Sequence, residues 1–158
     1  MHIEVSQHYD APAAAVHDML ADPAFWQLSM RGEPQVESSQ ADAVTGGVVL
    51  RLKVTAPSQV ARLVGDTLDM TLQATWLPDG DRWSGPVSID VSKVPGSFSG
   101  LCTIAPAGGG TNVAYSGDFS IKLPLVGKTL EQKAAPYLTA VLKAQQATGI
   151  IWLADHQS

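Results

Sequence analysis

Hydrophobic and polar residues alternate from the start of the chain and then change to a helical spacing. His2 to Tyr9 alternates strictly, which predicts a strand with one buried face. Ala13 to Leu20 has the apolar spacing of a short helix, with Asp10 near its cap and Pro12 in its first turn. A second short helix is predicted from the Asp22-Pro23 pair to about Met30.

From Glu33 to Ile121 the hydrophobic period is two, which predicts a series of strands. One apolar face and one polar face along each strand is typical of an antiparallel sheet. Gly- and Pro-containing turn signals at residues 78–80, 95–96 and 108–110 separate the strands. The stretch from Pro57 to Gly65 breaks the alternation, so we expect a short helix or flap there.

The last long element is a predicted helix from Pro124 to Leu153, with Pro136 expected to kink it. At about 100° per residue its apolar positions share one face. That face carries Leu130, Ala134, Tyr137, Leu138, Val141, Gln145, Thr148 and Trp152.

The order of these elements predicts an α+β fold of the helix-grip type, in a single domain over residues 1–158. A curved antiparallel sheet of about six or seven strands would wrap the C-terminal helix, with two short helices after the first strand. The apolar face of such a sheet needs a cover, and the last helix is the only long element available. Space enclosed between them predicts a container for a small molecule.

Composition and charge limit the kinds of partner and the cellular location that we expect. Hydrophobic residues make up 45% of the chain, charged residues 16%, and the net charge is −5, which argues against nucleic acid as a partner. The sequence contains no apolar run of about 18 residues, so we expect no membrane-spanning helix. The alternating N-terminus does not resemble a signal peptide. The single cysteine, Cys102, fits a cytoplasmic protein.

Motifs for catalysis, metals or cofactors are not apparent. Gly127-Lys128-Thr129 lacks the glycine that a phosphate-binding loop has five positions earlier, because Lys122 stands there. The four histidines have no metal-ligand spacing, and no nucleophile lies beside a base in a known motif. Cys102 falls on an apolar strand face, where an inert buried thiol is expected. We therefore predict no metal, no cofactor and no catalytic residue.

Strand parity and helical angle give twelve candidate residues for the wall of the cavity. They are Met70, Leu72, Trp83, Val87, Ile89, Phe98, Tyr115, Phe119, Tyr137, Val141, Gln145 and Thr148. The polar members need partners when buried. A neighbouring strand, a bound water or an apolar ligand that they orient would each satisfy them. If Gln145 orients a ligand, Gln145→Leu should weaken binding and have little effect on folding. If Gln145 instead bonds a neighbouring strand, the same change should destabilise the fold.

Several strings along the chain resemble the START-like (SRPBCC) superfamily. They are YDAP at residues 9–12, ADPAFW at 21–26, VGDTL at 64–68, IKLPLVGKTLE at 121–131 and WL at 152–153. The superfamily includes the birch-pollen allergen, lipid-transfer START domains and polyketide cyclases, and the strings look most like a mainly actinobacterial, uncharacterised branch. The resemblance implies a lipid, sterol, hormone or polyketide in the cavity between sheet and helix.

Three functions remain open from the sequence. The leading one is a cofactor-free protein that binds a hydrophobic small molecule or lipid. The second is a polyketide cyclase or aromatase, for which no inward His, Asp, Glu, Lys or Arg is predicted. The third is a protein-interaction module whose interior is filled by Trp83, Phe98 and Trp152. Residues 57–65, with Trp26 and Met30, are the expected gate of the cavity.

Overall fold

The computed structural model describes residues 1–56, 58, 61–62, 65–93 and 95–156. In chain order the helices and strands are β1 (His2–Tyr9), α1 (Ala13–Leu20), α2 (Pro23–Arg31), β2 (Val36–Val44), β3 (Gly47–Thr55), β4 (Thr67–Thr75), β5 (Leu77–Asp79), β6 (Arg82–Val91), β7 (Gly96–Ala107), β8 (Gly110–Ile121) and α4 (Gly127–His156). The α+β class and the predicted order of elements are confirmed.

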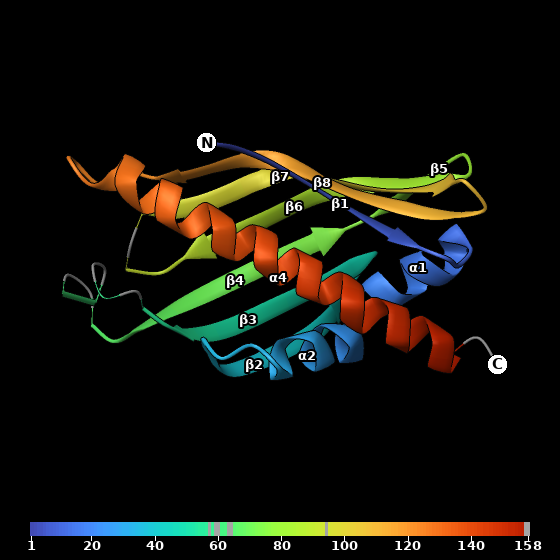
Figure 1. The fold of residues 1–158 in the computed structure, drawn as a ribbon, viewed down its shortest axis with the longest axis horizontal. Helices are drawn as coiled ribbons and strands as arrows, with labels where there is room; N and C mark the ends of the chain where they lie inside the picture. The colour runs from blue at the N-terminus through green and yellow to red at the C-terminus, as the bar shows by residue number, and fades with distance from the viewer. Residues whose placement is uncertain (57, 59–60, 63–64, 94, 157–158) are drawn as a thin grey trace.

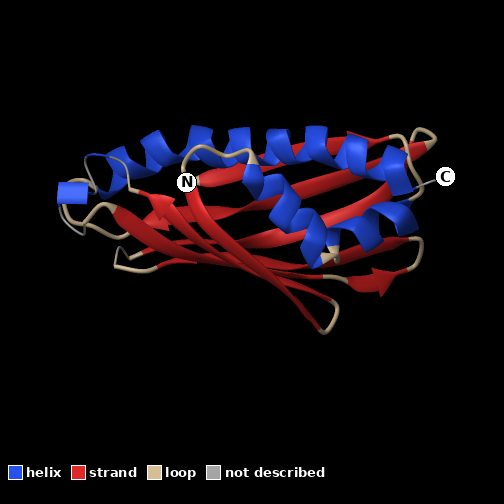
Figure 2. Ribbon diagram, turned by 90° about the horizontal axis from the view of Figure 1, so that it is seen from below, coloured by secondary structure: helices blue, strands red, loops and turns tan. Residues whose placement is uncertain are grey.

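All strands belong to one antiparallel sheet, within the part of the chain that the structure describes. The order across it is β1-β8-β7-β6-β4-β3-β2, and the three-residue β5 pairs with β6 outside that path. The sheet curves, and α4 crosses its concave face diagonally (Figure 1). Seen from below, α4 forms a second layer over the strands and the two short helices lie beside it (Figure 2). This is the helix-grip arrangement that the sequence predicted.

The start of α4 differs from its predicted position. Residues 124–126 form a turn, with Leu125 at a positive φ of 70°, and the helix begins at Gly127. A Cβ at Gly127 would lie 2.3 Å from the Ile121 carbonyl oxygen, so this joint between β8 and α4 requires glycine. The helix runs through Pro136 and ends at His156, three residues beyond the predicted end.

The short helices match their predicted spans, although one cap differs. The Asp22 carboxylate accepts a hydrogen bond from the Ala24 backbone N–H at 2.9 Å, as expected for the cap of α2. For α1 the capping residue is Pro12 itself, and no side chain caps the helix, so the predicted role of Asp10 is wrong. Packing must hold α1, because eight residues are too few for a helix stable on its own.

The dense part of the core lies where α1 and α2 cover one end of the sheet. Phe25 and Trp26 are fully buried there, and the Trp26 indole N–H donates to the Leu20 carbonyl at 2.7 Å, which ties α2 to α1. Phe25 also meets Trp152 of α4 edge to face. The C-terminal half of α4 is thereby fixed against the short helices, β1 and β8. Within the described residues, no helix backbone packs closely on β4, in the interior of the sheet.

Candidate functional site

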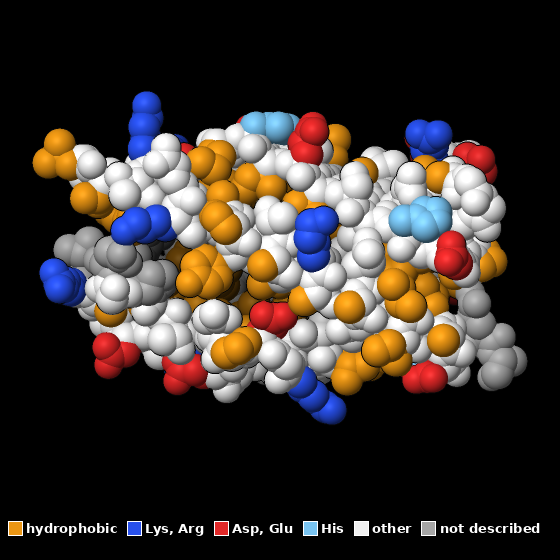
Figure 3. All heavy atoms as spheres, viewed as in Figure 1, with side chains coloured by type: hydrophobic (Ala, Val, Ile, Leu, Met, Phe, Trp, Pro, Cys, Tyr) orange, Lys and Arg blue, Asp and Glu red, His pale blue; other side chains and the backbone are white. Residues whose placement is uncertain are grey.

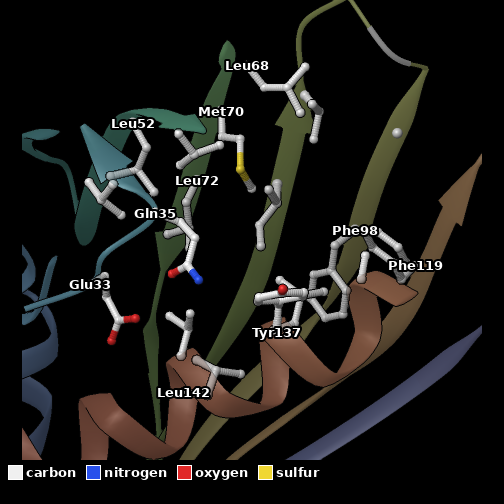
Figure 4. Close-up of a pocket in the computed structure, with 18 of the residues that line it drawn as sticks. Glu33, Gln35, Leu52, Leu68, Met70, Leu72, Phe98, Phe119, Tyr137 and Leu142 are labelled. Carbon is white, nitrogen blue, oxygen red and sulfur yellow. The ribbon is translucent and has the colours of Figure 1, made fainter. Parts of the chain in front are cut away.

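A cavity of about 670 Å³ lies between the concave face of the sheet and α4. Figure 3 shows a hollow bordered by apolar side chains beside the N-terminal half of α4. Figure 4 shows Leu68, Met70 and Leu72 entering the cavity from β4, and Phe98 and Phe119 lying near Tyr137 of α4. Apart from a few polar groups, the walls consist of aliphatic and aromatic side chains.

Ten of the twelve predicted wall residues line this cavity. They are Met70, Leu72, Val87, Ile89, Phe98, Tyr115, Phe119, Tyr137, Val141 and Gln145. Their parity follows from an unbroken antiparallel register from β4 through β6 and β7 to β8. That these residues bind a ligand remains a prediction.

Trp83 does not line the cavity, although its parity is the inward one. It lies on β6 beyond the end of the cavity, where α1 covers the sheet, and its ring stacks on His17 with centroids 4.7 Å apart. Alternation along a strand predicts the face on which a side chain lies, but not which helix covers that part of the face. The prediction for Trp83 is therefore wrong.

Thr148 is also outside the cavity. Its hydroxyl donates back to the Ala144 carbonyl at 3.3 Å, within α4 itself. The residue that follows, Gly149, is the one buried against the sheet. At 100° per residue Gly149 lies closer than Thr148 to the direction of Gln145. By this turn of α4, the face that packs on the sheet therefore carries Gly149 rather than Thr148.

Four polar wall residues were not predicted, and two of them are titratable. Glu33 and Gln35 lie between α2 and β2, Thr55 is the last residue of β3, and Lys133 lies on α4. Together with Tyr137, which is 57% exposed, they form the rim of the cavity. Figure 4 places Glu33 and Gln35 across the cavity from Phe98 and Phe119. Neither strand parity nor helical angle applies to a loop, so no pattern in the sequence indicates Glu33 and Gln35.

Hydrophobic side chains border the cavity at both ends along α4, and packing closes the end near Gly149. At one end Leu130 is buried in a small cluster with Ala56 and Leu68. At the other, a Cβ at Gly149 would lie 2.7 Å from Tyr9 Cε1 and 3.1 Å from Met19 Cε, so α4 rests directly on β1 and α1. The wall of α4 thus runs from Leu130 to Gln145, about 22 Å at 1.5 Å per residue.

Gln145 is the polar residue at the closed end, and it bonds to two strands. Its side-chain oxygen accepts hydrogen bonds from Gln7 Nε2 at 3.1 Å and from the Tyr115 hydroxyl at 3.3 Å. Gln7 also donates to the Leu142 carbonyl of α4 at 2.6 Å and accepts from the Tyr9 hydroxyl at 2.9 Å. Of the two outcomes that the sequence left open for Gln145→Leu, these bonds favour a loss of stability, because the change would remove the acceptor of two buried donors.

The buried titratable groups next to this end are held in their neutral forms. Burial raises the pKa of the Cys102 thiol to about 12 and raises the pKa of Tyr9 and of Tyr115 well above their ordinary values. The two tyrosines remain hydroxyl donors at neutral pH, and Cys102 remains an unreactive thiol.

We expect the free energy of unfolding to fall between about pH 9 and pH 10.5. In this range the unfolded chain releases the Cys102 proton, and then those of Tyr9 and Tyr115, while the folded chain retains them. Each group contributes a loss of at most about 1.4 kcal/mol per pH unit. Urea unfolding of the wild type and of Cys102→Ala measures the effect, and the variant should decline less steeply in the lower part of this range. A flat or rising profile in the wild type would contradict the burial of these groups.

Only part of the predicted gate falls within the described residues. Trp26 and Met30 are buried and line the cavity next to the rim. The predicted flap at 57–65 includes residues 57, 59–60 and 63–64, which lie outside the described residues.

The part of the chain that the structure describes contains neither a candidate metal site nor a candidate membrane-spanning helix. No group of three or more His, Cys, Asp and Glu residues is placed there to hold a metal ion. No helix in the same residues combines the length and the apolar character needed to cross a membrane.

The family model described as "Protein of unknown function (DUF2505)" matches residues 4–153 of this chain. No curated protein is significantly similar to the chain in sequence. The match extends from β1 to the last turn of α4, so the family covers all the elements that form the cavity.

Solved structures with the same fold come from bacteria and from humans. A protein from Thermus thermophilus, TTHA0849, is 17% identical over 100% of both chains, with a TM-score of 0.66. Human STARD10 is 14% identical over 99% of this chain and 67% of its own, with a TM-score of 0.64. Zhui aromatase/cyclase from a Streptomyces species is 18% identical over 97% of this chain and 90% of its own, with a TM-score of 0.56. These similarities show a START-like (SRPBCC) fold.

Proposed function

The chain belongs to the DUF2505 family, and we propose that it binds an elongated, mostly apolar small molecule or lipid between its sheet and α4. The observation that carries this proposal is the cavity of about 670 Å³, which is within the ordinary range for small-molecule sites. Apolar walls supply affinity by removing hydrocarbon surface from water. The fold shared with these neighbours supports a ligand-binding function.

The geometry favours binding over catalysis. Zhui is named an aromatase/cyclase, and such a reaction requires a proton donor or acceptor beside the substrate. Among the described residues of the deep wall, the titratable side chain is Tyr115, and burial raises its pKa far above neutrality. Glu33 and Lys133 lie at the rim, away from the closed end. We therefore place the cyclase function second.

The proposal of a filled interior has less support. Phe98 lies on the wall of the cavity, Trp83 stacks on His17, and Trp152 packs on Phe25 and His156. None of these three rings occupies the space between β4 and α4.

We further propose that the protein is cytoplasmic, since its one cysteine is a free thiol. We also propose that it has no nucleic-acid partner, since its net charge is −5.

Binding of N-phenyl-1-naphthylamine, a neutral fluorophore that brightens in apolar surroundings, tests the proposal. We expect saturable uptake of one probe per chain, with micromolar affinity, and release on addition of a long-chain competitor. Titration followed by fluorescence measures the stoichiometry. Absence of saturable uptake would count against a binding function, and turnover of a poly-β-ketone mimic would favour the cyclase.

A further inference from the structure

The closed end of the cavity has a fixed hydrogen-bonding polarity, which follows from one group that can only accept. That group is the backbone carbonyl of Leu142 in α4. Because it lies 2.6 Å from the side-chain amide of Gln7, that amide must present its nitrogen, which donates. The Gln7 oxygen then faces the Tyr9 hydroxyl, which donates to it at 2.9 Å.

Gln7 in turn fixes the orientation of Gln145. The Gln7 amide nitrogen has two hydrogens, and the second is directed to the Gln145 side-chain oxygen at 3.1 Å. The Tyr115 hydroxyl donates to the same oxygen at 3.3 Å. Rotating the Gln145 amide by half a turn would bring two amide nitrogens together and remove the acceptor of Tyr115. The side-chain oxygen of Gln145 is therefore committed to the protein.

The amide nitrogen of Gln145 remains available to the cavity. Gln145 is 2% exposed and lines the cavity, and its Nε2 makes no hydrogen bond among the described residues. The Gln145 Nε2 atom is also not fully enclosed by protein. Among the described residues, the fully enclosed side-chain nitrogen or oxygen that lacks a hydrogen-bond partner is Nε1 of Trp76. A buried donor without a partner is unfavourable, and an acceptor on a ligand would remove that penalty.

We infer that the ligand is an apolar molecule with a hydrogen-bond acceptor, such as a carbonyl oxygen, at one end, and that this end enters first and accepts a hydrogen bond from Gln145. This inference rests on the proposed binding function and adds the ligand's chemical class and direction. The packing of Gly149 against Tyr9 and Met19 ends the cavity just beyond Gln145, so an acceptor there must be terminal. The rest of the molecule then lies along the apolar wall toward Leu130.

A matched pair of ligands tests the inference on the unmodified protein. 2-Tridecanone and 2-methyltridec-1-ene have the same shape, but the carbonyl oxygen of the first is a CH₂ group in the second. In competition against N-phenyl-1-naphthylamine, we expect the ketone to bind about tenfold more tightly, the effect of one buried hydrogen bond. Equal binding of both would overturn the inference and leave the proposed function standing. If neither ligand nor probe bound, the proposed function would fail as well.

The infrared carbonyl stretch of bound 2-tridecanone supplies a direct readout of the bond. We expect it at lower frequency than in hexane, and at a frequency different from that of the wild type in Gln145→Leu, which lacks the Gln145 donor. Thr148→Leu, on the same helix but outside the cavity, is the matched control and should leave the stretch at its wild-type frequency. Since Gln145→Leu is expected to lose stability, its folded fraction is measured first by circular dichroism. A hexane-like frequency in the wild type would contradict the inference without any variant.

Discussion

Leu72→Trp should abolish uptake of the apolar probe while the protein remains folded. Leu72 enters the cavity from the middle of β4, where its neighbours across the sheet are Leu50 and Ile89. An indole placed there would occupy space that a ligand needs. Because the space is empty, the larger side chain should change the free energy of unfolding by less than about 1 kcal/mol, well under the usual penalty for overpacking a filled core. We expect the affinity for N-phenyl-1-naphthylamine to fall at least about a hundredfold.

Gln73→Trp is the matched control for this variant. Gln73 is the next residue of β4, and its exposed side chain lies on the opposite face of the sheet. The same large side chain placed there should leave probe affinity within about twofold of the wild type. Equal losses of binding in the two variants would indicate damage to the sheet rather than occupation of the cavity. Undiminished binding by Leu72→Trp would place the probe elsewhere.

The largest expected loss of stability comes from Gln7→Leu. Gln7 is buried and makes three hydrogen bonds, to Leu142, Gln145 and Tyr9. Leucine would leave the buried Tyr9 hydroxyl without its acceptor and remove a donor from the Gln145 oxygen. With about 1–3 kcal/mol for each buried group left unpaired, we expect the free energy of unfolding to fall by about 2–4 kcal/mol.

Urea unfolding at neutral pH measures this loss, with Gln73→Leu as the control. Gln73 is exposed on β4, so the same chemical change should alter stability there by no more than about 0.5 kcal/mol. If Gln7→Leu were as stable as the wild type, the hydrogen-bonded chain from Tyr9 to Gln145 would not hold α4 against β1. The inference about ligand polarity would then lose its basis.

The strands, and the face on which each of their residues lies, were predictable because the hydrophobic period of a strand (two residues) differs from that of a helix (about 3.6 residues). Leu72 and Phe119 both lie on the wall of the cavity, as alternation along β4 and β8 predicts. The spans of β1 and α1 also match their predicted bounds, Tyr9 and Leu20 being their last residues. In these segments the hydrophobic pattern and the local turn residues favour the same structure.

The remaining parts of the site depend on how separate elements pack, which local patterns do not determine. Trp83 has the parity of a wall residue, yet α1 covers it, and Glu33 reaches the rim from a loop that has no periodicity. The role of Gln145 depends on two strands far away in sequence, through Gln7 and Tyr115. The sequence showed a polar residue on an apolar helix face but not its partners.

The most direct test of the central claim is a measurement of intermolecular nuclear Overhauser effects between bound 2-tridecanone and the methyl groups of the protein. We expect the acyl end to show effects to Val141, near Gln145, and the hydrocarbon end to show effects to Met70 and Leu130. Effects confined to the exposed side chains of Leu101 and Ile150, which lie outside the cavity, would contradict an internal binding site.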